Sequence, residues 1–264
     1  MPRIRRAAAA ILVLALACGL GAPRLPAQDA ESRFRLLPGL GAGYFARTIS
    51  WDEKARESKL ASVLAFARGE LRFDDGFSVG LFAGYGLTNP NGIVFRGLPF
   101  SLDYEAGAIG AILVGADLRK VLFQAGDFEF GVTARYERSF ASTSELEIAS
   151  LNQAGTAKAT SSWQRFLAGP FVRYLGYESF SPFLAVTFDK LWGEFTMAET
   201  IGDLSGSETK PVSGKGVFGI VLGTNFEPIP GFRLSGELTA IPYTKLAGGL
   251  DVDYGIALRA VFGL

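Results

Sequence analysis

Sixteen charged residues of this chain have side-chain types and a spacing that would let them form ion pairs with one another. Each lies in a segment where apolar and polar residues alternate, on the face opposite the apolar one. Arginine and carboxylate side chains in such a set favour ion pairs and bidentate hydrogen bonds. The set comprises Arg47, Arg68, Glu70, Arg72, Asp117, Arg119, Glu129, Arg135, Glu137, Arg165, Arg173, Asp189, Arg233, Glu237, Asp253 and Arg259.

Two interpretations of this set are open. If the segments close into a narrow barrel, the charged side chains must meet inside it, and they then form a structural network that fills the lumen. Alternatively, the same charges line a polar pathway for small solutes.

Other kinds of chemistry are poorly supported. The chain has no histidine, which removes imidazole bases and imidazole metal ligands, so we expect no catalytic residue, metal or cofactor. The acids Glu194, Glu199, Asp203 and Glu208 are interpreted as solvated loop residues rather than calcium ligands. The glycine-rich run 39–43 is followed by no helical pattern, so it does not predict a dinucleotide site.

The amino terminus has the organisation of a secretory signal. Arginines at 3, 5 and 6 precede an apolar run from Ala7 to Leu20, and the segment Ala22-Pro-Arg-Leu-Pro-Ala27 follows before Gln28. We therefore expect a cleaved signal at 1–27, a short periplasmic lead-in at 28–36 and one domain at 37–264. Cys18, the only cysteine, is removed with the signal unless it is the lipidated first residue of a lipoprotein.

Without the signal the chain has 22 basic and 26 acidic residues, because four arginines lie in residues 1–27. A net charge of −4 gives no reason to expect a nucleic-acid partner. No stretch reaches the roughly 20 apolar residues of a membrane-spanning helix. If the protein enters a membrane, it must do so as a barrel.

Short and long connections alternate along the chain and define the strands. The short ones, rich in turn-forming residues, are 74–76, 125–127, 176–179 and 228–231. The long polar ones are 51–60, 89–102, 141–160, 199–214 and 242–250. Nine connections join ten strands, which predicts an all-β fold, a closed antiparallel up-and-down transmembrane barrel with both termini on one side.

Three details of this scheme can be checked against a structure. The segment 217–226 is apolar on both faces, so its orientation is left open. Pro170 lies inside a strand, where it predicts a β-bulge. Aromatic residues beside the short turns predict one girdle at the membrane boundary, and the second is expected from Trp51, Tyr85, Tyr104, Tyr136, Trp163, Trp192 and Tyr254. A soluble β-sandwich is the alternative, but it does not require charge on the buried face.

The last fourteen residues alternate without interruption. They resemble the carboxy-terminal assembly signal of bacterial outer-membrane barrels, with apolar residues at every second position: Tyr254, Ile256, Leu258, Ala260, Phe262 and Leu264. The hairpin around Ala168–Tyr174 and Phe180–Phe183 is similar to those of small outer-membrane barrel domains. The resemblance implies location in an outer membrane, contact with its lipid, and dependence on the barrel-assembly machinery and periplasmic chaperones.

The expected function is structural or interactive, with loops that could meet an unknown extracellular ligand. A narrow porin-like channel is the alternative. The omptin proteases are similar in size, but their catalysis needs a histidine beside aspartates, and barrel lipid deacylases need a histidine–serine pair. A hydrolase that works without histidine is therefore only a remote alternative, and we expect no enzyme.

Overall fold

The computed structural model describes residues 34–52, 56–98, 102–103, 107–148, 155–263. The predicted signal, Cys18, Tyr104 and Leu264 lie outside these ranges. The described part of the chain is built of strands, and no helix in it is long and apolar enough to cross a membrane. The strands are β1 (Phe34–Trp51), β2 (Arg56–Phe73), β3 (Phe77–Asn91), β4 (Val94–Phe95), β5 (Leu102–Asp103), β6 (Ile109–Ala125), β7 (Phe128–Ile148), β8 (Gly155–Tyr174), β9 (Phe180–Ile201), β10 (Leu204–Gly214), β11 (Phe218–Ile229), β12 (Phe232–Thr244) and β13 (Leu250–Phe262).

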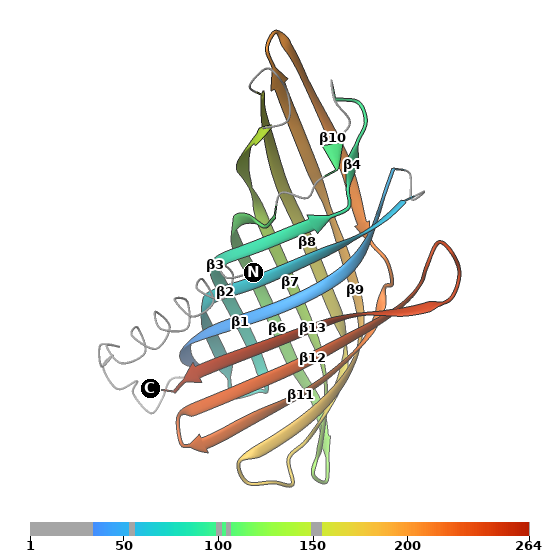
Figure 1. Cartoon of the computed structure of the whole chain (residues 1–264). Helices are drawn as coiled ribbons and strands as arrows, with labels where there is room; N and C mark the ends of the chain where they lie inside the picture. Colours follow the sequence, from blue (N-terminus) through green and yellow to red (C-terminus); the bar gives the residue numbers. More distant parts are fainter. Residues whose placement is uncertain (1–33, 53–55, 99–101, 104–106, 149–154, 264) are drawn as a thin grey trace.

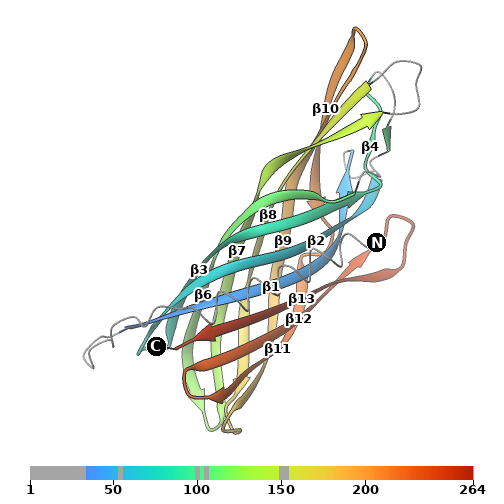
Figure 2. The same ribbon diagram turned by 60° about the vertical axis from the view of Figure 1, so that its left-hand side comes forward.

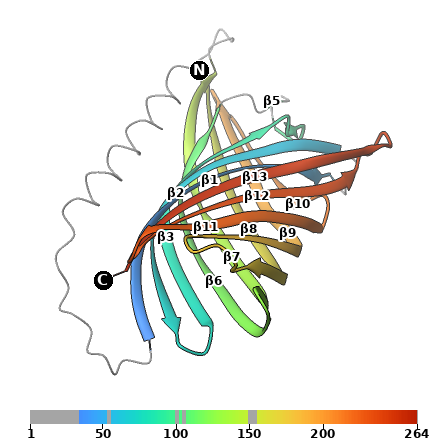
Figure 3. The ribbon, with the colours of Figure 1, turned by 90° about the horizontal axis from the view of Figure 1, so that it is seen from below.

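Ten strands form a closed antiparallel ring. The order is β1, β2, β3, β6, β7, β8, β9, β11, β12 and β13, and β13 pairs again with β1 from Gly39↔Val261 to Ala46↔Tyr254. The sheet curves round on itself in the views of Figures 2 and 3. The predicted fold class and strand number are confirmed.

The two ends of the barrel differ. Both ends of the described chain and the four short connections lie at one end, here called the turn end, where Phe34 pairs with Phe73 and Phe232 with Phe262. The opposite end is called the loop end. Short turns of outer-membrane barrels face the periplasm, so the loop end is extracellular. Because β1 begins at Phe34, the expected lead-in at 28–36 overlaps this strand by three residues.

The outer surface carries a band of exposed apolar side chains. They include Leu81, Ile112, Val186, Phe218, Leu238 and Leu258. The strand left open in the sequence, β11, is oriented by this band, since Phe218, Ile220 and Leu222 point outward and Val221 is buried. A closed antiparallel sheet with an apolar exterior satisfies every backbone group in lipid. The chain is an integral outer-membrane β-barrel protein.

Two predicted loops are in fact strands. The connection 199–214 is a hairpin in which β10 pairs with the last residues of β9, turning at Gly202 with a φ of 56°. Most of 141–160 belongs to β7 and β8. Figure 1 shows these strands rising beyond the rest of the barrel at the loop end. Their outward residues meet water and are polar, which is why the sequence resembled a loop.

The prediction of a β-bulge at Pro170 is also wrong. The pairs Ala168↔Phe188 and Phe171↔Ala185 keep one register, and Pro170 pairs with Val132 of β7 without a shift. The β8–β9 ladder has no pair at Gly169 and Pro170, so the missing amide hydrogen is accommodated without an extra residue.

Candidate functional site in the barrel lumen

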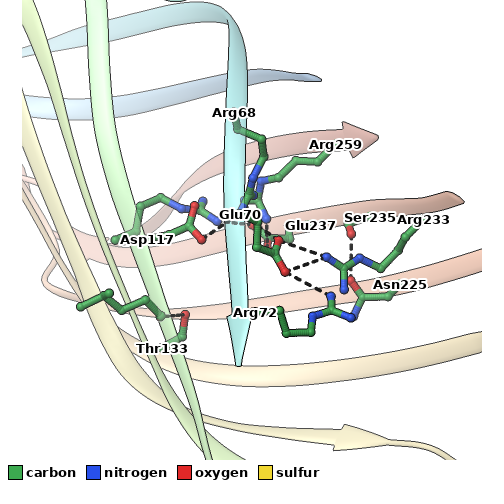
Figure 4. Close-up of polar contacts among 12 residues, drawn as sticks. Arg68, Glu70, Arg72, Asp117, Thr133, Asn225, Arg233, Ser235, Glu237 and Arg259 are labelled. Carbon is green, nitrogen blue, oxygen red and sulfur yellow. Dashed lines mark hydrogen bonds and ion pairs between the residues drawn. The ribbon is translucent and has the colours of Figure 1, made fainter. Parts of the chain in front are cut away.

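The charged residues of the lumen form three centres, each organised around a carboxylate. Glu70 of β2 is the first. Its carboxylate accepts hydrogen bonds from Arg68 at 3.1 Å, from Arg72 at 3.1 Å and from Arg233 at 2.9 and 3.0 Å. Arg233 lies on β12, which is separated from β2 by β13 and β1 round the ring, so this contact spans the lumen (Figure 4). Arg68 also donates to Asp117 of β6 at 3.0 Å.

Glu237 of β12 is the second centre. Arg259 of the neighbouring β13 donates to both carboxylate oxygens, at 2.7 and 2.6 Å, and Arg135 of β7 reaches it from the other side of the barrel at 3.1 Å. Nearby, Arg173 pairs with Glu129. The contacts of Glu237 join β7, β12 and β13 across the interior, and the Arg173–Glu129 pair joins β8 to β7.

The third centre, Asp189 of β9, lies closer to the loop end. Arg47 of β1 donates to it at 2.7 Å, and Arg165 of β8 donates through Nε to both oxygens at 3.1 Å. Arg47 also donates to the carbonyls of Lys215 and Gly216, at 2.9 and 3.0 Å. Arg47 and Asp189 are buried, so the geometry must compensate for the loss of hydration.

Three further residues of the predicted set lie around these centres. Glu137 is 4.0 Å from Arg165. Asp253 accepts from the amide and hydroxyl of Thr48, at 2.7 and 3.0 Å, just beyond the last β1–β13 pair, and its Oδ2 is 3.5 Å from Nε of Arg47. Arg119 lies over the rings of Phe171 and Phe183, 5.0 and 5.1 Å from their centroids. The set predicted from the sequence thus divides into separate clusters rather than one network.

Towards the loop end the interior is apolar, which the sequence analysis missed. Fully buried Ile49, Leu60, Leu113 and Leu191 surround Trp163, and Phe45 packs edge-on against its ring at 5.1 Å. Trp163 of β8 donates through Nε1 to Thr88 of β3 across the barrel, at 2.9 Å. We call these six apolar residues and Thr88 the apolar layer. Ile93, Phe95 and Leu98, from the connection after β3, are buried in the same cluster.

Trp51 and Trp163 therefore do not belong to the expected second girdle, since their exposed fractions are 3% and 0%. Tyr85 and Tyr254, with exposed fractions of 51% and 53%, do lie on the outer surface. The apolar layer had a signal in the sequence: Leu191, Phe195 and Met197 continue the inward face of β9, while the outward positions become polar. This reversal of polarity predicts an apolar interior only if the position of the membrane boundary along the strand is known.

The largest cavity described in the lumen lies at its turn end. A cavity of about 340 Å³ is bounded there by Phe73, Asp74 and Gly76 of the β2–β3 turn and, deeper, by Arg135 and Arg259. Beyond them is a space of about 40 Å³, lined by Phe45, Phe82 and Arg165 among others. The apolar layer then separates this space from the loop end.

The predicted assembly signal forms β13 and lies where the barrel closes. Tyr254, Ile256 and Leu258 are exposed on the outer surface, Ala260 pairs with Leu40 and Leu234, and the Phe262 ring lies 5.4 Å from that of Phe232. Leu264 lies outside the described residues. Two of the acids interpreted as solvated loop residues lie on strands: Glu199 is buried on β9, and Glu208 of β10 accepts from the Gly97 amide at 2.8 Å and pairs with Lys210 at 2.6 Å. No group of three or more acidic or cysteine side chains among the described residues is placed to hold a metal ion.

No family model matches the chain, and no curated protein matches it. Solved structures do. The outer membrane protease OmpT from Escherichia coli is 13% identical, with 90% of this chain and 100% of that chain covered and a TM-score of 0.46. The translocator domain of the autotransporter NalP from Neisseria meningitidis is 11% identical, with coverage of 89% and 90% and a TM-score of 0.44. An outer membrane channel from Pseudomonas putida F1 is 10% identical, with coverage of 92% and 100% and a TM-score of 0.41. These likenesses indicate no activity for this chain.

Proposed function

We propose that the protein is a non-conducting outer-membrane barrel with a structural and surface-interaction role, which anchors a rigid extracellular β-structure. The observation that carries this proposal is the apolar layer. Trp163 and Phe45 meet in the middle of the lumen, and leucine and isoleucine side chains close the space around them. A hydrated ion crossing this layer would lose its water without gaining a charged or carbonyl ligand.

The extracellular strands support the second part of the proposal. β8 and β9 are 20 and 22 residues long, about twice the 9–11 residues that a transmembrane strand needs. Their inward residues at the loop end pack together, and Glu208 fastens β10 to the connection after β3. The hairpins thus form a shaped surface that an extracellular ligand could recognise.

A catalytic role is not part of the proposal. The lumen carboxylates Glu70, Asp189 and Glu237 each accept hydrogen bonds from two or more arginines. Arginine donates hydrogen bonds and accepts none, so the oxygens of these carboxylates are occupied by arginine N–H groups rather than free to contact a substrate.

The partners we propose are membrane lipid, the assembly machinery and its chaperones. β13 is the last strand and pairs with both β1 and β12, so closure depends on it. Deleting Gly255–Leu264 should prevent recovery of a heat-modifiable membrane form. Normal recovery of the truncated protein in that form would contradict this dependence.

Conductance in a planar bilayer tests the proposed function directly. The wild-type protein should be silent or nearly so, because the apolar layer blocks the lumen. The double variant Phe45→Ala, Trp163→Ala should conduct where it folds, since it removes the two largest side chains of the layer. Trp192→Ala, on the outward face of the same barrel, should stay silent. Steady, ion-selective conductance from the wild type would overturn the proposal in favour of a narrow channel.

A further inference from the structure

The cavity at the turn end, here called the turn-end pocket, carries an excess of positive charge. Eight arginines and four carboxylates line it. Glu237 lies just beyond the lining and pairs with two of those arginines, Arg135 and Arg259. Counting it still leaves three positive charges, whereas the centre nearer the loop end has the arginines Arg47 and Arg165 beside three acids. The charges of the lumen are therefore separated along the barrel axis.

The arginines of the turn-end pocket are also short of acceptors. Glu70 is shared by Arg68, Arg72 and Arg233, and Arg68 also pairs with Asp117. Arg119 stacks on two phenylalanine rings. The Nε atoms of Arg68, Arg173 and Arg233 are buried without a hydrogen-bond acceptor among the described residues. These guanidinium groups therefore have more N–H donors than the described carboxylates accept, and an anion in the pocket would supply further acceptor oxygens to the N–H groups that face it.

We propose that the turn-end pocket binds a small multivalent anion of the phosphate class, entering from the periplasmic side. Guanidinium groups present planar pairs of donors that match phosphate oxygens. The volume, about 340 Å³, is at the lower end of the range for small-molecule pockets. The apolar layer closes its inner end, so the anion would be held rather than transported. The phosphate belongs either to a soluble compound or to a lipid headgroup of the inner leaflet, and the chemistry recognised is the same.

Isothermal titration with inorganic pyrophosphate, at low salt and in a non-ionic detergent, tests this proposal. The wild type should bind one pyrophosphate per barrel. Arg119→Gln removes a cation that makes no ion pair among those described, and Arg72→Gln removes a half-exposed cation at the rim. Each should weaken binding about tenfold. Asp74→Asn, in the turn that borders the pocket, removes a negative charge and should tighten binding severalfold.

The matched control is Arg138→Gln, because Arg138 lies over Phe140 and does not line the pocket. It should leave binding unchanged. Competition by phosphatidylglycerol in nanodiscs would identify a lipid headgroup as the source of the phosphate, and its absence a soluble ligand. No saturable binding of pyrophosphate by the wild type, or equal weakening by Arg138→Gln, would overturn the proposal. Neither result depends on conductance, so this test is independent of the proposed function.

Discussion

Along β9 the outward residues Leu184, Val186 and Phe188 are followed, nearer the loop end, by Glu194, Thr196 and Thr200. The inward residues change in the opposite sense, from Thr187 and Asp189 to Phe195 and Met197. The first part of the strand belongs to a membrane barrel, and the second to a water-soluble one. We call these parts of the barrel the membrane half and the extracellular half.

The difference shows that one continuous sheet can meet two solvents by reversing its polarity. In lipid, an apolar exterior is free of cost, and polar side chains gather inside, where they must pair. In water, apolar side chains are driven inward, and the polar ones face outward. The backbone pairing is the same in both halves, so only the side chains record where the bilayer ends.

The largest effect should come from the apolar layer. Trp163→Ala removes a fully buried ring, its contact with Phe45 and a hydrogen bond to Thr88, and should lower the free energy of unfolding by about 4 kcal/mol. Urea unfolding in detergent measures it. Trp192→Ala is the matched control on β9 and should cost less than about 1 kcal/mol. Equal losses would show that the layer is not a packed core.

The next effect concerns the charge centre at the boundary between the halves. Asp189→Asn leaves the guanidinium groups of Arg47 and Arg165 without their shared counter-ion and should cost about 3 kcal/mol. The exposed pair of Glu145 with Lys158, at 3.4 Å, supplies the control. Glu145→Gln should change stability by less than about 0.5 kcal/mol. An Asp189→Asn variant with the same free energy of unfolding as the wild type would mean that this charge centre does not stabilise the barrel.

A charge added to the outer surface should distinguish the two solvents. Val186→Arg places a cation on the apolar band and should cost about 2 kcal/mol when unfolding is measured in liposomes. Thr196→Arg, ten residues along the same face of β9, should be nearly neutral because that position meets water. Comparable costs at both positions would place the whole strand in lipid.

The smallest effect is a titration at the loop end, outside the membrane. Hydrogen bonds from Lys245, the Val252 amide and Tyr243 lower the pKa of Asp251 to about 2. The ionised carboxylate therefore stabilises the folded protein fully above the ordinary pKa of aspartate. This stabilisation is lost as the pH falls towards 2. Lys245→Met should raise the pKa of Asp251 in a carboxyl NMR titration. An unchanged pKa would show that the ion pair with Lys245 does not lower the pKa of Asp251.

Much of the fold followed from the sequence because the membrane half obeys one simple pattern. β3 and β13 alternate strictly, and the short turns contain residues suited to them, so strand number and facing were predictable. The hairpin of β9 and β10 was not, since Thr196 and Thr209 on its outer surface have the composition of a loop. The pattern of that region is the one expected for a soluble sheet.

The charged residues could be assigned to the lumen, but their partners could not. Glu70 meets Arg233 and Asp189 meets Arg47 across the barrel, over separations of 163 and 142 residues. Such contacts depend on strand tilt and stagger, which alternation does not encode. The prediction for Trp163 was wrong for a related reason. A tryptophan near the membrane boundary belongs to a girdle only if its side chain points outward, and the alternation did not show which way Trp163 points.

The reversal of polarity is tested most directly by site-directed spin labelling along the outward face of β9. Single cysteines can be placed at Leu184, Val186, Phe188, Thr196, Ala198 and Thr200 in a chain whose only cysteine is Cys18. Power saturation in liposomes should show the first three labels more accessible to oxygen than to a water-soluble nickel chelate, and the last three the reverse. Labels at Thr196 to Thr200 that respond as lipid-exposed would contradict the account.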